Sequence, residues 1–182
     1  MSTPLNVLFV CTANICRSAY ADVRARSWLA DRRRLGELAP LEIDSAGTWG
    51  WDAQPIEENM GALAAARGSD PSGFASERLV TSQVQGADVI LTAAREHRIF
   101  ILEDWPGALA KTYTLGQFAE SLDLVEPGLH GREAIAGVRA ARHPARPAAD
   151  VVDPYRRGPQ AAAECADHID DLLARILPRL AG

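Results

Sequence analysis

The sequence predicts an α/β protein in which helices flank a parallel sheet of four strands. Short apolar runs alternate along the chain with segments of helical periodicity, which is the pattern of right-handed βαβ units. The 182 residues are enough for one hydrophobic core, so we expect residues 1–182 to form a single domain. Hydrophobic residues make up 47% and charged residues 24% of the chain, which is typical of a globular protein and excludes a disordered one.

Four segments have the composition of buried strands. The first, residues 5–10, is short, apolar and rich in β-branched and aromatic side chains, and it ends at the polar segment that begins with Cys11. The other three strands are predicted at residues 41–44, 88–92 and 111–114.

Helices are predicted between and after these strands. The first follows Ser18 and ends in three arginines at 32–34, whose charge favours the negative end of a helix. Shorter helices are predicted at residues 56–67, 94–102 and 115–122. The last helix, residues 159–180, is the clearest, because its apolar side chains fall on one stripe. Cys165 belongs to that stripe, so we expect it to be a packed core thiol.

Residues 125–150 interrupt the alternation of strands and helices. Three prolines, three glycines and four arginines surround one short helix predicted at 132–142. We interpret this segment as an insertion in the domain. Because it immediately precedes Asp153, we hypothesise that it borders the functional pocket and that its arginines help select partner proteins.

Composition also limits the class of function. The net charge of −5 argues against a general nucleic-acid binder, and no run of about 18 apolar residues predicts a membrane span. The N-terminus lacks the basic start and cleavage site of a secretory signal, so we expect a cytoplasmic protein. The histidines show no metal-ligand spacing, and we expect no metal or cofactor; we interpret them all as surface or capping residues. They are His97, His130, His143 and His168.

The segment from Cys11 to Ser18 has the residues of an anion-binding loop. A cysteine and an arginine separated by five residues can form the two ends of a loop that curls around a phosphate, with backbone N–H groups and a helix N-terminus pointing inward. These groups and Arg17 favour the thiolate of Cys11, and the planar guanidinium of Arg17 can hold two phosphate oxygens. Asn14 suits a left-handed turn, and Ser18 suits either a hydrogen bond to the thiolate or a helix cap.

The sequence leaves two alternatives open here. In one alternative Cys11 is a small buried residue and Arg17 a surface residue, although the strand before and the helix after them favour the loop. Asp153, followed by Pro154, has the properties of a general acid on a stiff loop, but the pair also occurs in ordinary turns.

Residues 7–18, VLFVCTANICRS, resemble the active-site signature of the low-molecular-weight protein tyrosine phosphatases, and Asp153-Pro154-Tyr155 resembles their general-acid motif. The similarity extends through residues 44–48 and 87–98 and the closing helix. It implies three layers, with helices on both faces of a four-stranded parallel sheet and the phosphate-binding loop after the first strand. It also implies hydrolysis of protein phosphotyrosine through a phosphocysteine, without a cofactor.

The resemblance also implies a role for each matching residue. Cys11 becomes the nucleophile, Arg17 the phosphate clamp and Asp153 the general acid. Backbone amides of the loop hold the phosphate, and hydrogen bonds from Asn14, Ser18 and Ser45 keep the loop in shape. The loop residues expected to bind substrate are Thr12, Ala13, Asn14, Ile15, Cys16 and Ser18.

Cys16 matches a second loop cysteine that can pair with the nucleophile on oxidation; the alternative is a silent packing residue. Aromatic walls for a phenyl ring are expected from Trp49, Trp51 and Tyr155, and the sequence does not decide between the two tryptophans. Three residues depart from the family pattern without removing a catalytic group: Ala13 replaces a glycine, Ala19 a proline and Phe74 a histidine.

Other activities of related proteins remain alternatives. Ile15 stands where an arginine phosphatase of the family has threonine, and its apolar side chain favours an aryl phosphate. An arsenate reductase-type thiol enzyme would need further cysteines, and only Cys165 lies outside the loop. A catalytically silent module that binds phosphotyrosine or senses redox state is the third alternative. The expected partners are tyrosine-phosphorylated proteins, with no nucleic acid or membrane, and the expected state is a monomer or weak dimer.

Overall fold

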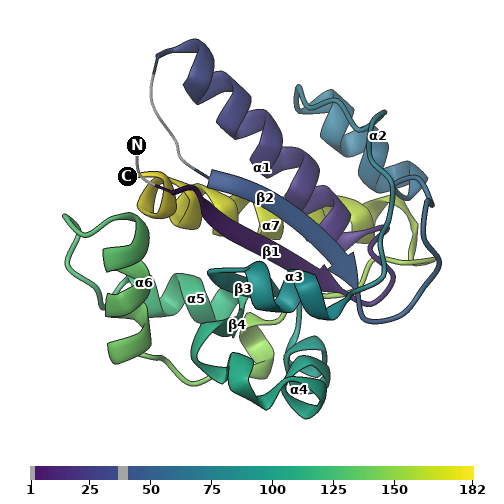
Figure 1. Cartoon of the computed structure of the whole chain (residues 1–182). Helices are drawn as coiled ribbons and strands as arrows, with labels where there is room; N and C mark the ends of the chain where they lie inside the picture. The colour runs from purple at the N-terminus through teal and green to yellow at the C-terminus, as the bar shows by residue number, and fades with distance from the viewer. Residues whose placement is uncertain (1–2, 37–40) are drawn as a thin grey trace.

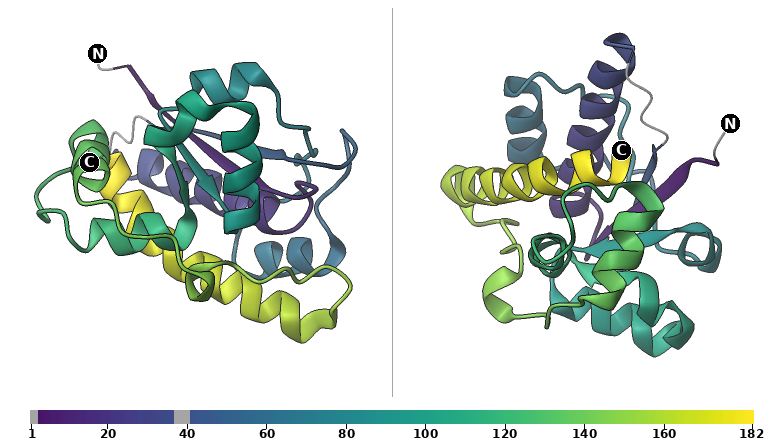
Figure 2. Two further views of the ribbon diagram at one scale, coloured as in Figure 1. Left: turned by 90° about the horizontal axis from the view of Figure 1, so that it is seen from below. Right: turned by 90° about the vertical axis from the view of Figure 1, so that its left-hand side faces the viewer.

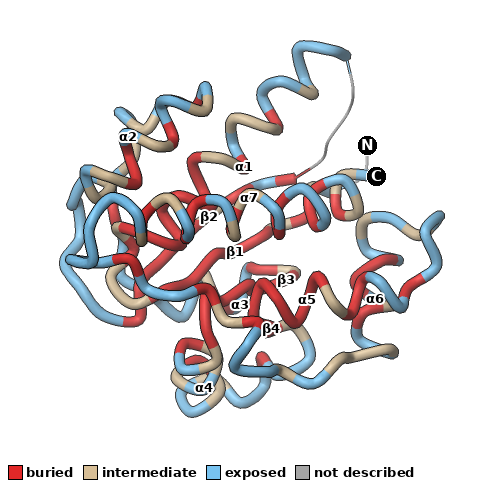
Figure 3. The backbone as a smooth tube through the Cα atoms, turned by 180° about the vertical axis from the view of Figure 1, so that it is seen from behind, coloured by how far each residue is buried: buried red, intermediate tan, exposed pale blue. Residues whose placement is uncertain are grey.

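The computed structural model describes residues 3–36 and 41–182, and its centre is a sheet of four parallel strands (Figure 1). The strand order is β2-β1-β3-β4. The strands are β1 (Leu5–Cys11), β2 (Leu41–Gly47), β3 (Val89–Thr92) and β4 (Thr112–Thr114). Nearly every strand residue is buried (Figure 3), as the continuous apolar runs predict for a parallel sheet with both faces covered. The predicted fold class is confirmed.

Seven α-helices surround the sheet in the described part of the chain. They are α1 (Arg17–Arg34), α2 (Glu58–Ala66), α3 (Thr81–Gly86), α4 (Arg95–Asp104), α5 (Leu115–Leu122), α6 (Gly131–Ala140) and α7 (Gly158–Ala181), and two 3₁₀ turns lie at Pro106–Lys111 and Pro147–Ala149. The short helix α3 and both 3₁₀ turns are absent from the sequence prediction. With six residues and one buried side chain, Val84, α3 has no periodicity to detect. Across the described ranges, no helix combines the length and apolar character needed to cross a bilayer.

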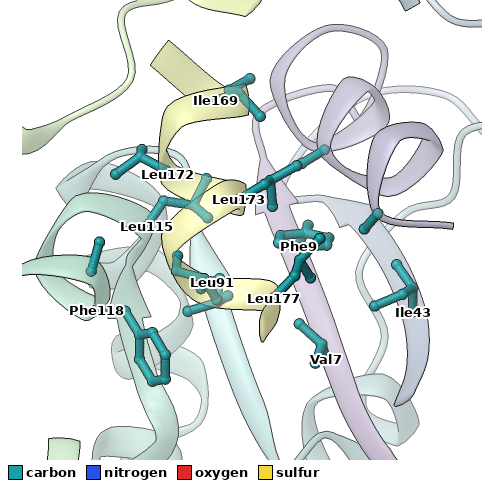
Figure 4. Close-up of a cluster of buried hydrophobic side chains, with 14 of the residues drawn as sticks. Val7, Phe9, Ile43, Leu91, Leu115, Phe118, Ile169, Leu172, Leu173 and Leu177 are labelled. Atoms are coloured by element: carbon teal, nitrogen blue, oxygen red, sulfur yellow. The ribbon is translucent and has the colours of Figure 1, made fainter. Parts of the chain in front are cut away.

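The alternation of side chains along β1 divides the core into two layers. Val7 and Phe9 face the larger cluster, which contains residues of α1, α5 and α7 (Figure 4). Leu8 and Val10 face the smaller cluster under α3 and α4. The long helix α7, yellow in Figure 2, carries Ile169, Leu172, Leu173 and Leu177 into the larger cluster. Its predicted apolar stripe is therefore confirmed.

The segment at residues 125–150 packs into the domain. Its helix α6 buries Ala134, Ile135 and Val138 against α5 and α7. Arg132 of this helix pairs with Asp88, which precedes β3 and so lies at the amino ends of the strands. This is the edge of the sheet opposite to Cys11, because all the strands run in the same direction.

A substitution at Gly116 of α5 tests the packing of residues 125–150 against the rest of the domain. A Cβ built at Gly116 would collide with the carbonyl oxygen of Ala149 and lie 2.7 Å from its Cβ. Alanine stabilises a helix by about 1 kcal/mol relative to glycine, but overpacking costs about 1–3 kcal/mol, so Gly116→Ala should lower the free energy of unfolding. Urea denaturation would measure this change. Gly107→Ala, with no atom within 4 Å, is the control, and a Gly116→Ala protein as stable as wild type would contradict the packing.

Candidate active site

The loop from Cys11 to Ser18 connects the end of β1 to the start of α1, at the carboxyl edge of the sheet where ligands of such folds bind. The segment after β2 lies directly against it. Thr48 N–H donates to the carbonyl of Cys11 at 2.9 Å, and Trp49 N–H donates to that of Thr12 at 2.7 Å. Gly47 permits this approach, since a Cβ there would lie 2.7 Å from the Thr12 oxygen.

Asn14 holds the shape of the loop. Its φ of 55° is the left-handed conformation predicted from the sequence. Its buried amide nitrogen donates to Ser18 Oγ at 2.8 Å and Ser45 Oγ at 3.0 Å, and its amide oxygen accepts the Glu77 N–H at 2.9 Å. Ser45 in turn donates to the buried carboxylate of Asp22 at 2.7 Å. The side-chain amide therefore joins the loop to β2 and to the segment before α3.

Ser18 connects this network to the candidate nucleophile. Its Oγ lies 2.9 Å from Sγ of the buried Cys11. Since Ser18 Oγ already accepts a hydrogen bond from Asn14, its own hydrogen is available to the sulfur, which is closer than the other acceptor, the carbonyl oxygen of Ala46 at 3.5 Å. The alternative role as a helix cap is not found, because the cap position of α1 is Cys16, which makes no side-chain cap bond.

Arg17 is the first residue of α1, and its side chain is only 3% exposed. Nη1 donates to the carbonyl of Val151 at 3.3 Å, and Nη2 donates to Thr12 Oγ1 at 3.2 Å and to Asp153 Oδ2 at 2.9 Å. The buried Nε has no hydrogen-bond partner among the described residues. A buried, unpartnered donor is unfavourable, so this nitrogen fits an anion bound in the loop.

A second loop brings Asp153 to the guanidinium. Val151 N–H donates to the carbonyl of Ala93 at 2.8 Å, and Asp150 accepts both the N–H and Nε of Arg95 at 3.1 and 3.0 Å. Asp150 is thus occupied at the start of α4. Asp153 is about half exposed at 48%, and its other oxygen accepts the Tyr155 N–H at 3.1 Å. The structure therefore separates the two carboxylates, with only Asp153 at the loop.

A cleft of about 240 Å³ opens above the loop. Its lining residues are Cys11, Thr12, Ala13, Ile15, Cys16, Arg17, Gly50, Trp51, Gln54, Asp153 and Tyr155. Gly50 and Gln54 are not predicted from the sequence, because they belong to no motif. No residue of 125–150 lines the cleft, so the hypothesis that this segment borders the pocket is wrong. Three of its four arginines have partners elsewhere: Arg132 binds Asp88, Arg142 binds the Thr112 carbonyl and Arg146 binds Glu120.

The two tryptophans occupy different places. Trp51 is a wall of the cleft and is 81% exposed, and Tyr155 also lines the cleft. Trp49, which we also expected in the pocket, does not line it. Its ring packs edge-on against Phe100, with centroids 6.4 Å apart, and Arg78 lies over the ring at 5.7 Å. These contacts turn Trp49 away from the cleft toward α4.

Ala13 is accommodated where the family pattern has glycine. Its φ is not positive, so alanine adopts this backbone conformation without strain. The chain instead places Gly50 over it: a Cβ at Gly50 would lie 3.1 Å from Ala13 Cα and 3.3 Å from Ala13 Cβ. The additional methyl group at 13 is therefore matched by a glycine opposite.

All three cysteines are free and buried. Burial, with a contribution from Cys11, raises the pKa of Cys16 far above its ordinary value, and burial raises the pKa of Cys165 to about 12. Both are therefore thiols at neutral pH. Cys165 lies on the buried stripe of α7, so its prediction as a core thiol is confirmed.

His97 is a capping residue, as one of the two interpretations from the sequence has it, but it is not at the surface. It does cap a helix, since its Nδ1 accepts the Ala94 N–H at 3.1 Å, but only 2% of it is exposed. Its Nε2 lies 2.9 Å from Thr12 Oγ1. The only signal in the sequence was its position just after β3, at the sheet edge where the site forms. In the described ranges, no group of three or more His, Cys, Asp or Glu residues is arranged to hold a metal ion.

A family model described as "Low molecular weight phosphotyrosine protein phosphatase" matches residues 6–141. The low molecular weight protein-tyrosine-phosphatase Etp of Escherichia coli (strain K12) is 27% identical over 133 residues, 73% of this chain and 84% of Etp. A protein-arginine-phosphatase of Geobacillus stearothermophilus is 28% identical over 120 residues, 66% of this chain and 75% of that protein. The solved structure of a low molecular weight protein tyrosine phosphatase from T. tengcongensis has a TM-score of 0.72 at 25% identity, covering 97% of this chain and 99% of that one.

The burial of His97 predicts a pH-dependent stability. Burial, and to a smaller degree the charge of Arg17, lowers the pKa of His97 from 6.5 to about 4. Between these pH values the unfolded chain binds a proton at His97 that the folded protein does not. The contribution of His97 to the free energy of unfolding is therefore complete above pH 6.5 and is lost as the pH falls toward 4. Relative to His97→Gln, wild type should lose about 2–3 kcal/mol of unfolding free energy between pH about 7.5 and 4.5. Urea unfolding at the two pH values measures this, and a pH-independent difference would contradict it.

Proposed function

The chain belongs to the low molecular weight phosphotyrosine protein phosphatase family, and from this premise we propose that it hydrolyses phosphotyrosine in proteins through a phosphocysteine intermediate. One observation carries the proposal. A single cleft brings together the sulfur of Cys11, the guanidinium of Arg17 with its unpartnered Nε, and the carboxylate of Asp153. These are a nucleophile, an anion clamp and a proton donor.

In the first step the Cys11 thiolate attacks phosphorus and the bond from phosphorus to the tyrosyl oxygen breaks. Asp153 gives its proton to that oxygen, so tyrosine leaves neutral. In the second step water attacks the phosphocysteine, Asp153 takes a proton from the water, and the thiolate and inorganic phosphate are released. The hydroxyl of Ser18, 2.9 Å from Sγ, stabilises the sulfur anion that leaves.

Arg17 changes partners during this cycle. In the structure its Nη2 is paired with Asp153 at 2.9 Å. A phosphate dianion offers Arg17 stronger acceptors than a carboxylate does, so we expect the guanidinium to turn from Asp153 to the phosphoryl oxygens when substrate binds. The guanidinium and the amides of the loop then hold the three non-bridging oxygens before and during transfer.

The walls of the cleft support an aryl phosphate. Trp51 and Tyr155 offer flat apolar surfaces to a phenyl ring, and Ile15 adds an aliphatic wall with no hydrogen-bonding group. Phosphoarginine is the second candidate substrate, because one relative is named a protein-arginine-phosphatase. The guanidinium of that substrate would meet no polar group at Ile15.

Replacing the proposed nucleophile and acid tests the mechanism. Cys11→Ser should abolish turnover of p-nitrophenyl phosphate, whereas equal rates for wild type and variant would indicate a silent binding module. Asp153→Asn should slow hydrolysis of phenyl phosphate, which has a poor leaving group, by about 10²–10⁴-fold, and should slow p-nitrophenyl phosphate less.

Asp150→Asn is the matched control for the general acid. Asp150 lies three residues away but binds Arg95, so its loss should affect both phosphate esters alike and more weakly. If Asp150→Asn selectively lost activity on phenyl phosphate and Asp153→Asn did not, the proton donor would be Asp150 and the assignment of Asp153 would be wrong.

Substrate preference tests the aryl pocket. We expect peptides carrying phosphotyrosine to be hydrolysed at least tenfold faster, by kcat/KM, than peptides carrying phosphoserine or phosphoarginine. Ile15→Thr, which introduces a hydroxyl at the wall, should raise the relative rate on phosphoarginine. Faster hydrolysis of phosphoarginine by wild type would favour the second candidate, and thiol-dependent reduction of arsenate without ester hydrolysis would favour a reductase.

A further inference from the structure

His97 contacts the phosphate-binding loop from a distant part of the chain. It is the third residue of α4, 85 residues after Thr12, and its imidazole is buried between that helix and the loop. His97 Nε2 and Arg17 Nη2 both lie within hydrogen-bond distance of Thr12 Oγ1, at 2.9 and 3.2 Å. The carboxylate of Glu96 is 3.4 Å from the same Nε2, so Thr12 is the closer partner.

The contacts of the ring determine its tautomer. The Ala94 backbone N–H can only donate, so His97 Nδ1, 3.1 Å away, must be the unprotonated acceptor. The pKa lowered by burial keeps the imidazole neutral at physiological pH, and its one hydrogen is therefore on Nε2. His97 donates this hydrogen to Thr12 Oγ1.

These two donors determine where the hydroxyl hydrogen of Thr12 can point. An arginine has no acceptor, so Arg17 Nη2 also donates to Thr12 Oγ1. A hydroxyl oxygen has two lone pairs, and His97 and Arg17 occupy both. The hydrogen of the hydroxyl has no acceptor among the described residues, and Thr12 is a lining residue of the cleft.

We propose that the Thr12 hydroxyl donates a hydrogen bond to a non-bridging oxygen of the bound phosphoryl group, and that His97 is the positioning residue that orients it. The inference rests on the proposed function, because it assigns a further phosphate contact in that site. The hydroxyl joins the Nε of Arg17 as a side-chain donor to the tetrahedral anion. His97 acts through Thr12 and does not touch the substrate.

A purely structural His97 would behave differently. As a cap of α4 it would stabilise the fold, and its replacement would lower the free energy of unfolding without changing phosphate affinity through Thr12. As a positioning residue its effect on phosphate affinity requires the Thr12 hydroxyl. A double-mutant cycle between the two positions separates these roles.

The experiment measures the Kd of inorganic phosphate by calorimetry in folded variants. Thr12→Val, which keeps the shape but removes the hydroxyl, should raise Kd about 10- to 100-fold, the range expected for a hydrogen bond to a charged group. Thr12→Ser keeps a hydroxyl and should recover about tenfold of that loss. His97→Leu should raise Kd about 2- to 10-fold in wild type and less than twofold in the Thr12→Val background.

His97→Gln is the conservative control, because its amide can accept the Ala94 N–H and still donate to Thr12; it should restore phosphate affinity relative to His97→Leu. An unchanged Kd in Thr12→Val, or equal effects of His97→Leu in both backgrounds, would overturn the inference. Circular dichroism verifies folding, and if Thr12→Val does not fold, Thr12→Ala replaces it in the cycle.

Phosphate affinity does not depend on turnover, which keeps the two proposals distinguishable. If the wild-type protein binds phosphate but does not hydrolyse p-nitrophenyl phosphate, the proposed function is overturned. The double-mutant cycle would then still decide whether the Thr12 hydroxyl binds phosphate. Wild type that binds no phosphate would overturn both.

Discussion

The site depends on the burial of one positive charge, the guanidinium of Arg17. Burying this group is unfavourable unless its N–H groups have acceptors, and Thr12, Val151 and Asp153 supply them. Two of these acceptors come from a loop 134 and 136 residues further along the chain, so the charge joins two distant segments. Arg17 lines the cleft, and its Nε has no hydrogen-bond partner among the described residues. The same buried charge therefore assembles the site and leaves a donor for an oxyanion.

Backbone strain is concentrated around the cleft. Asn14, Ala53 and Arg156 are the residues other than glycine with positive φ in the described part of the chain, at 55°, 59° and 58°. The first lies in the phosphate-binding loop, the second follows the Trp51 wall, and the third follows Tyr155. Such conformations are unfavourable for side chains with a Cβ and persist where the surrounding contacts enforce them. At Asn14 those contacts are the hydrogen bonds to Ser18, Ser45 and the Glu77 N–H, which give the strained loop a fixed shape.

Local chemistry explains which parts the sequence could predict. The β1–loop–α1 unit is encoded within residues 5–34, so its strand, its left-handed Asn14 and its helix follow from nearby residues alone. The direction of a side chain depends on tertiary neighbours: Trp49 turns toward Phe100, and His97 is buried because β3 brings α4 beside Thr12. Proximity in sequence was misleading for residues 125–150, since α6 packs at the opposite edge of the sheet and the chain returns to the site only where Asp150 binds Arg95.

The most direct measurement of the central claim is mass spectrometry of the protein after acid quenching during turnover of p-nitrophenyl phosphate, whose good leaving group depends little on the general acid. With the Asp153→Asn protein, in which activation of water is slowed, a phosphoryl group should accumulate on the peptide that contains Cys11 and be absent in Cys11→Ser. Hydrolysis that proceeds without any phosphorylated Cys11, or with the phosphoryl group on a different residue, would contradict the assignment of this sulfur as the nucleophile.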